Sequence, residues 1–231
     1  MSKVPLILLH GALGSSRYFE PYLEALSKNF DVHLLNFEGH ANAPTDSPFS
    51  VDLFAQNLVA FINERGLNNV CVFGYSMGGY VALKVALTHP NLIGKIVTLG
   101  TKFNWSPTIA AKEIRMLNPE LVEEKIPKFA ANLKVLHAPH DWKIVMAKTA
   151  LVMQLLGEGK GLKETDFESI QQDVIIGVGE LDKMVTVDES EKVAAALPNG
   201  ECEVLEKVVH PIEMIPQEVV LQFIHKHLLK Q

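Results

Sequence analysis

The sequence has few cysteines, little positive charge and no long apolar stretch. Cys71 and Cys202 both lie in apolar runs typical of strands, so we interpret them as small buried side chains rather than as a disulfide. A formal net charge of -6, without any cluster of Lys and Arg, predicts that the protein binds no nucleic acid. No stretch approaches the ~20 apolar residues that a membrane span needs, so we expect no membrane attachment.

The N-terminal residues lack the features of a signal peptide. Lys3 and a run of about five apolar residues lead directly into His10-Gly11, and no small-residue cleavage site follows. We therefore expect a cytoplasmic protein. The sequence gives no indication of the oligomeric state.

The apolar residues alternate between strand-like and helix-like patterns. The chain has 231 residues, of which 48% are hydrophobic, and this suits one large α/β domain. Repeated alternation of strand and helix predicts a mostly parallel, twisted sheet with helices on both faces. The expected strands are 6–9, 32–37, 70–73, 93–99, 174–178 and 203–209, and the expected helices are 19–30, 52–64, 76–88, 188–196 and 216–229.

The alternation stops between residues 101 and 169, where the sequence is only helical or irregular. We expect this segment, 101–169, to form a helical lid inserted into a core made of residues 1–100 and 170–231. Its large apolar side chains, together with one residue of the first loop, are candidates for lining a substrate pocket. The main candidates are Leu13, Phe103, Trp105, Trp142 and Met146, and further ones are Met116, Leu117, Phe129, Met153 and Leu156.

Three residues of this segment, His137, His140 and Asp141, are of types that bind metal ions. The break at Pro139 and the lack of further ligands nearby favour a solvated loop instead. We therefore expect no metal site, and no other motif indicates a cofactor.

The most informative motif is Gly74-Tyr75-Ser76-Met77-Gly78, which fits the pattern G-x-S-x-G. An apolar strand precedes it, and a helix of small and aliphatic residues follows. A serine on so sharp a strand-to-helix turn has a strained backbone, and the flanking glycines leave room for it. The turn projects the hydroxyl from the sheet, above a helix N-terminus that favours negative charge. We therefore predict that Ser76 is a nucleophile.

At this point the chain resembles the α/β-hydrolase superfamily, over nearly its whole length. Members of that superfamily carry their triad in the chain order serine, acid, histidine, which here implies Ser76, Asp182 and His210 as catalytic residues. The resemblance rests on His10-Gly11 after the first strong strand, Glu38-Gly39-His40, the turn at Ser76, Glu180-Leu181-Asp182 and His210.

The positions of other candidates support this choice of base and acid. His210 is expected directly after a strand, at the carboxyl edge of the sheet, where open α/β sheets place their sites. His225 and His227 lie among lysines on the last helix and are expected on the surface. Of the rival acids, Asp188 is expected to cap a helix, and Glu213 follows His210 and so breaks the order.

Acyl transfer also needs hydrogen-bond donors for the developing oxyanion, each worth ~3 kcal/mol. The resemblance implies that one donor is the backbone N–H of Met77, the residue after the nucleophile. It implies that the other is the N–H of the residue after His10-Gly11, which is Ala12, with Leu13 as the second choice.

These residues predict a serine hydrolase that cleaves a small, mainly uncharged carboxylic ester through an acyl-enzyme on Ser76. The chain has only three arginines, Arg17, Arg65 and Arg115, which disfavours a polyanionic substrate but not a single carboxylate. Two alternatives stay open. One is a lyase or thioesterase that uses the same triad, and the other is a small-molecule receptor of the same fold that retains the triad.

Overall fold

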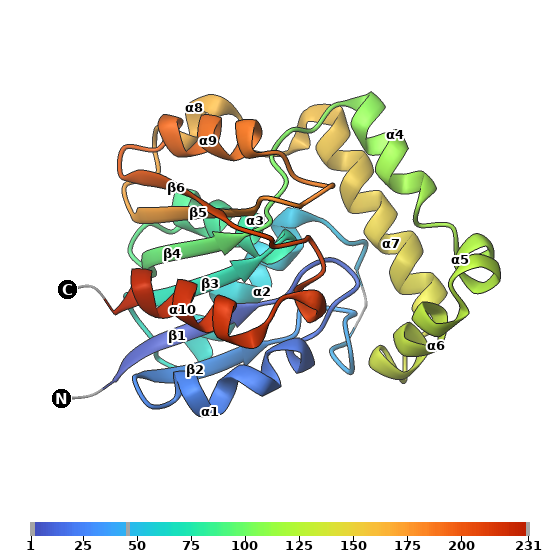
Figure 1. The fold of residues 1–231 in the computed structure, drawn as a ribbon, viewed down its shortest axis with the longest axis horizontal. Coiled ribbons are helices and arrows are strands. Elements are labelled where there is room, and N and C mark those ends of the chain that lie inside the picture. Colours follow the sequence, from blue (N-terminus) through green and yellow to red (C-terminus); the bar gives the residue numbers. More distant parts are fainter. Residues whose placement is uncertain (1–2, 45–46, 230–231) are drawn as a thin grey trace.

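Six strands form one sheet in the computed structural model, which describes residues 3–44 and 47–229 (Figure 1). The strand order is β2-β1-β3-β4-β5-β6, and every neighbouring pair is parallel. The predicted α/β class with a parallel sheet is therefore confirmed. Met1 and Ser2, at the start of the N-terminal stretch, lie outside the described residues. The strands are β1 Val4–Leu9, β2 Phe30–Leu35, β3 Val70–Tyr75, β4 Ile93–Leu99, β5 Asp173–Gly179 and β6 Gly200–Leu205.

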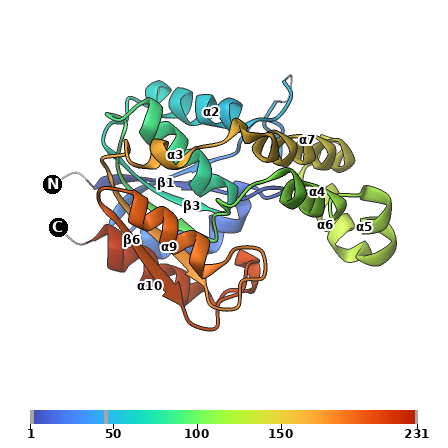
Figure 2. The same ribbon diagram turned by 90° about the horizontal axis from the view of Figure 1, so that it is seen from above.

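Helices cover both faces of this sheet. Successive residues of a strand point to opposite faces, so Ile7 and Leu9 of β1 join one buried cluster while Leu6 and Leu8 join another. The first cluster includes α2, α3 and α9, and the second includes η1, α1 and α10; Figure 2 shows α2 and α3 on the side opposite α10. The bounds are η1 Ser16–Tyr22, α1 Leu23–Leu26, α2 Val51–Glu64, α3 Met77–Thr88, α9 Val187–Ala196, η3 Ile212–Met214 and α10 Gln217–Leu228.

The segment between β4 and β5 is helical, and α4 to α7 stand together beside the carboxyl edge of the strands (Figures 1 and 2). Three of its prolines occupy the first helical positions, where the missing N–H and the fixed φ of proline favour a helix start. The elements are α4 Pro107–Arg115, α5 Pro119–Lys125, α6 Pro127–Leu136, α7 Trp142–Leu155, the π turn η2 Leu156–Lys160 and α8 Glu164–Phe167. No helix among the described residues is long and apolar enough to cross a membrane.

Several predicted features differ from the observed ones. The helix expected over 19–30 is a 3₁₀ helix followed by the four-residue α1, because Pro21 interrupts α-helical hydrogen bonding. Strand β6 ends at Leu205, so His210 lies in the following loop rather than directly after the strand. His227 is not on the surface: it lies on the buried face of α10, with Nε2 2.6 Å from an oxygen of Glu203.

Candidate active site

The turn between β3 and α3 holds Ser76 in a conformation that few L residues adopt, with φ 50° and ψ -117°. Such a conformation costs ~1–3 kcal/mol and persists only where the surroundings fix it. The glycines around it are packed too closely for side chains. A Cβ on Gly74 would lie 2.5 Å from Cα of Gly79, and a Cβ on Gly78 would lie 2.4 Å from the carbonyl oxygen of Leu9. The glycine spacing of the motif therefore follows from this packing.

Two loops at the carboxyl edge of the sheet bring His210 and Asp182 to Ser76. The Oγ atom of Ser76 lies 3.4 Å from Nε2 of His210, and Nδ1 of His210 lies 2.7 Å from Oδ2 of Asp182. The other carboxylate oxygen of Asp182 accepts hydrogen bonds from the amides of Met184 and Val185, at 2.8 and 2.9 Å. The three residues that the sequence selects thus form a continuous chain of contacts.

The surroundings of Asp182 favour its ionised form. Its side chain is 1% exposed, and burial opposes ionisation, but the hydrogen bond and charge of His210 and the two amide donors outweigh burial and lower the pKa of Asp182. A carboxylate at this position accepts the Nδ1–H of His210 and leaves Nε2 free to accept a proton from Ser76. The hydroxyl of Tyr75 donates to the carbonyl oxygen of His210 at 2.7 Å and so fixes the loop.

The residues expected to form the oxyanion hole lie beside Ser76. Ala12 and Met77 both line the cavity onto which the Ser76 side chain opens. Met77 is the first residue of α3, so its N–H is among those that have no partner within the helix. Leu13, which follows Ala12, has a φ of 56° and lines the same cavity.

A cavity of about 370 Å³ lies between the sheet edge and helices α4 to α7. Of the predicted pocket residues, Leu13 and Trp105 line it, whereas Phe103, Trp142 and Met146 do not. The charged residues among those that the structure shows lining it are Lys102, Glu113 and Glu213; Arg17, Arg65 and Arg115 are not among them. Its apolar wall includes Tyr80, Met116, Leu117, Val122, Ile126, Phe129, Val152, Met153, Leu156 and Met184.

The three predicted pocket residues outside this cavity pack elsewhere for clear reasons. The ring of Phe103 packs against Tyr80 and Phe167, with ring centroids 6.1 and 5.8 Å apart. Trp142 and Met146 lie on the same stripe of α7 as the lining residue Met153, but farther towards the helix N-terminus, where they are buried in the core. Helical spacing alone does not reveal where along the stripe a cavity ends.

His137, expected in a solvated loop, is fully buried at the end of α6. Its Nε2 lies 3.1 Å from the carbonyl oxygen of Leu13, and its Nδ1 accepts a hydrogen bond from the amide of Ala41. The inserted helices are thereby tied to the loop that carries Ala12. Among the described residues, no group of three or more His, Cys, Asp or Glu is arranged to hold a metal ion.

Three buried histidines lie near the loop that carries Ala12, and all three are uncharged near neutral pH. They are His10, His40 and His137. Burial lowers the pKa of His10 to about 4, and it lowers the pKa values of His40 and His137 as well. The ring centroids of His40 lie 4.9 and 5.7 Å from those of His10 and His137. Protonating one ring therefore disfavours protonating the others.

We expect acid to destabilise the protein through these histidines. The folded-state pKa of His10 lies below its unfolded value of 6.5, so the unfolded chain binds protons first as the pH falls. Stability is thus present above about pH 6.5 and lost towards pH 4, by about 3 kcal/mol from His10 alone. Thermal unfolding of His10→Gln should show a shallower fall of Tm between pH 6.5 and 4.5 than wild type. The exposed control His89→Gln should follow wild type, and equal slopes for all three proteins would contradict this.

Two residues of the cavity wall, Lys102 and Glu113, are not among the residues predicted for the site. Lys102 lies just after β4 and Glu113 lies in α4, and no sequence motif marks either of them. Their ammonium nitrogen and carboxylate oxygen lie 3.8 Å apart, with both side chains largely buried. A lysine and a glutamate eleven positions apart on different elements carry no local signal of such a pair.

This fold is that of a known family of proteins. A family model described as the alpha/beta hydrolase fold matches residues 4–149. The chain therefore belongs to the alpha/beta hydrolase fold family, as its resemblance implied, and it is a hydrolase of that fold.

Individual relatives are consistent with this assignment. The chain is 27% identical over 225 residues to a protein of Pseudomonas savastanoi pv. phaseolicola that carries the name carbamate hydrolase RutD, with 87% of this chain and 85% of the relative covered. It is 30% identical over 113 residues, 49% of this chain and 42% of the relative, to the pimeloyl-(acyl-carrier protein) methyl ester esterase of Edwardsiella ictaluri. A thermophilic esterase from Thermogutta terrifontis has the same fold, with a TM-score of 0.76 at 20% identity over 97% of this chain and 89% of that one.

Proposed function

We propose that the protein is a serine hydrolase that cleaves a small, mainly uncharged carboxylic ester through an acyl-enzyme on Ser76. The observation that carries this proposal is the chain of contacts from Ser76 through His210 to Asp182, which opens onto a largely apolar cavity. A serine hydroxyl is a weak nucleophile at neutral pH and needs a base in hydrogen-bond reach. Nε2 of His210 is at that distance, and Asp182 orients the ring.

In the proposed reaction, Oγ of Ser76 attacks the ester carbonyl carbon while His210 takes the hydroxyl proton. The amides of Ala12 and Met77 stabilise the negative oxygen of the tetrahedral intermediate. His210 then donates its proton to the leaving alcohol, and the acyl group stays on Ser76. Water attacks this acyl-enzyme with His210 again as the base, which releases the acid and restores Ser76.

The cavity favours a modest, mainly uncharged substrate. Its volume of about 370 Å³ is at the lower end of the ~300–1,000 Å³ usual for small-molecule pockets. None of the three arginines lines it, and its lysine, Lys102, lies beside Glu113, so the cavity disfavours a polyanionic substrate. We also propose that residues 101–169 act as a lid, because α4 to α7 supply much of the cavity wall.

A panel of p-nitrophenyl esters from acetate to decanoate tests this function. Because the cavity is small and apolar, we expect kcat/KM to peak at a short or medium acyl chain and to fall by decanoate. A p-nitrophenyl carbamate and a thioester in the same panel separate the proposed esterase from a carbamate hydrolase or thioesterase. Absence of turnover, together with a ligand-induced rise in Tm, would instead favour a receptor.

A further inference from the structure

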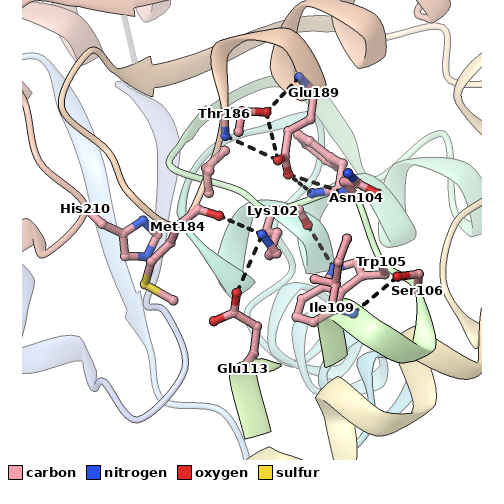
Figure 3. A network of polar contacts seen from close by, with 12 residues as sticks. Lys102, Asn104, Trp105, Ser106, Ile109, Glu113, Met184, Thr186, Glu189 and His210 are labelled. Carbon is pink, nitrogen blue, oxygen red and sulfur yellow. Dashed lines mark hydrogen bonds and ion pairs between the residues drawn. The ribbon is translucent and has the colours of Figure 1, made fainter. Parts of the chain in front are cut away.

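Lys102 and Glu113 place two opposite charges in the wall of an otherwise largely apolar cavity (Figure 3). Their side chains are 16% and 5% exposed, and the ammonium nitrogen lies 3.8 Å from Oε1 of Glu113. Buried ion pairs are costly to desolvate and contribute little net stability compared with apolar side chains. We therefore expect a charged pair in the wall of a substrate cavity to have a role other than stabilising the fold.

The backbone that carries Lys102 is held rigidly. The amides of Phe103 and Asn104 donate to the buried carboxylate of Glu189, at 2.9 and 3.2 Å. The indole Nε1 of Trp105 donates to the carbonyl oxygen of Lys102 at 3.1 Å. Figure 3 shows these contacts around the Lys102 side chain, with Glu113 on the neighbouring helix and His210 nearby. Such fixed groups bind a ligand with little loss of conformational entropy.

Both side chains keep unused hydrogen-bonding capacity. The ammonium group of Lys102 has three donors, and one of them goes to the carbonyl oxygen of Met184 at 2.6 Å. The 3.8 Å separation from Glu113 is too long for a hydrogen bond. The other oxygen of Glu113, Oε2, is buried without a partner among the described residues. The last torsion of a glutamate is soft, so this carboxylate can turn towards a ligand in the cavity.

We propose that Lys102 and Glu113 form a substrate subsite for a neutral group that both accepts and donates hydrogen bonds, such as a hydroxyl or a primary amide. This inference rests on the proposed function, because it assigns the subsite to the same substrate. The ligand oxygen accepts from Lys102, and its O–H or N–H donates to Glu113. A carboxylate would pair with Lys102 but repel Glu113, and an ammonium group would do the reverse. The natural ester thus carries such a group on its acyl or alcohol part.

Ligand pairs that differ at one group test this subsite. They are methyl ω-hydroxyalkanoates from butanoate to octanoate and ω-hydroxyalkyl acetates, each matched with the ester in which a methyl replaces the hydroxyl. Calorimetry on Ser76→Ala gives the Kd of each ester without relying on turnover. The comparison protein adds Lys102→Met and Glu113→Met together, which avoids leaving one buried charge unpaired. The control adds Lys143→Met and Glu123→Met, an ion pair of the same helical segment whose residues do not line the cavity.

We compare the Kd of the ester that ends in a methyl group with the Kd of its partner that ends in a hydroxyl. For at least one chain length, the ratio of the first Kd to the second should be at least about tenfold smaller in the comparison protein than in Ser76→Ala. The control should keep the original ratio, and monomethyl adipate and methyl 6-aminohexanoate should bind more weakly than the hydroxyl ester. A ratio that is the same in all proteins at every length would overturn the proposal and leave the pair with a structural role, tying Lys102 to the loop of Asp182. Failure of the proposed function shows separately, as wild type that binds these esters but hydrolyses none.

Discussion

Replacing Ser76 with alanine is expected to lower kcat for the best ester of the panel by about 10⁵-fold. The substitution removes the hydroxyl that lies 3.4 Å from Nε2 of His210 and with it the covalent route. KM should change little, because the cavity wall and the amides of Ala12 and Met77 remain in place. The residual rate comes from binding and oxyanion stabilisation alone. Steady-state kinetics with p-nitrophenol release measures this difference.

The matched control is Ser169→Ala, which removes an exposed hydroxyl of a residue that does not line the cavity. This variant should retain wild-type kcat. The Ser76→Ala variant should also unfold at a Tm no lower than wild type, because within the described part of the chain Oγ of Ser76 has no hydrogen bond besides that with His210. A Ser76→Ala enzyme that keeps a tenth or more of wild-type kcat would contradict the assignment of the nucleophile.

The second large effect is expected for Asp182→Asn, with a fall in kcat of about 10⁴-fold. The asparagine oxygen still accepts from the amides of Met184 and Val185, so its NH₂ group faces Nδ1 of His210. Nδ1 must then accept, which puts the ring proton on Nε2. In that tautomer the imidazole is unable to take the proton of Ser76.

The control for this variant is Asp188→Asn, an exposed aspartate that pairs with Lys192 on the surface of α9. It should leave kcat unchanged. Tm of Asp182→Asn is measured alongside the kinetics, so that a fall in rate is not mistaken for unfolding. A loss of less than tenfold with an intact fold would mean that Asp182 does not orient the base.

Local sequence signals were sufficient for the turn at Ser76. The glycine spacing of the motif follows from contacts between near neighbours, such as Gly74 against Gly79, and the strand before the turn, β3, is an unbroken run of buried residues. Predicting Asp182 and His210 required more than a local motif, since only their order in the chain links them to Ser76. The structure brings them together through two loops at one sheet edge, although His210 lies farther past its strand than expected.

Other parts of the site depend on tertiary packing and carry no local signal. His137 reads as a loop residue until the fold buries it against the carbonyl oxygen of Leu13. Trp142 and Met146 share a helix face with true lining residues, and only the position of neighbouring helices decides which of them meets the cavity. Lys102 and Glu113 meet only because α4 packs beside the chain that leaves β4.

The most direct test of the central claim is to identify the residue that carries the covalent bond. A p-nitrophenyl alkylphosphonate reacts with an activated serine at phosphorus and releases p-nitrophenol, and the phosphonyl group that stays on Oγ resembles the tetrahedral intermediate. Intact mass spectrometry and peptide mapping should find one adduct per chain, on Ser76, with matching loss of esterase activity and no adduct on Ser76→Ala. An adduct on a different residue, or full loss of activity without any adduct on Ser76, would contradict the account.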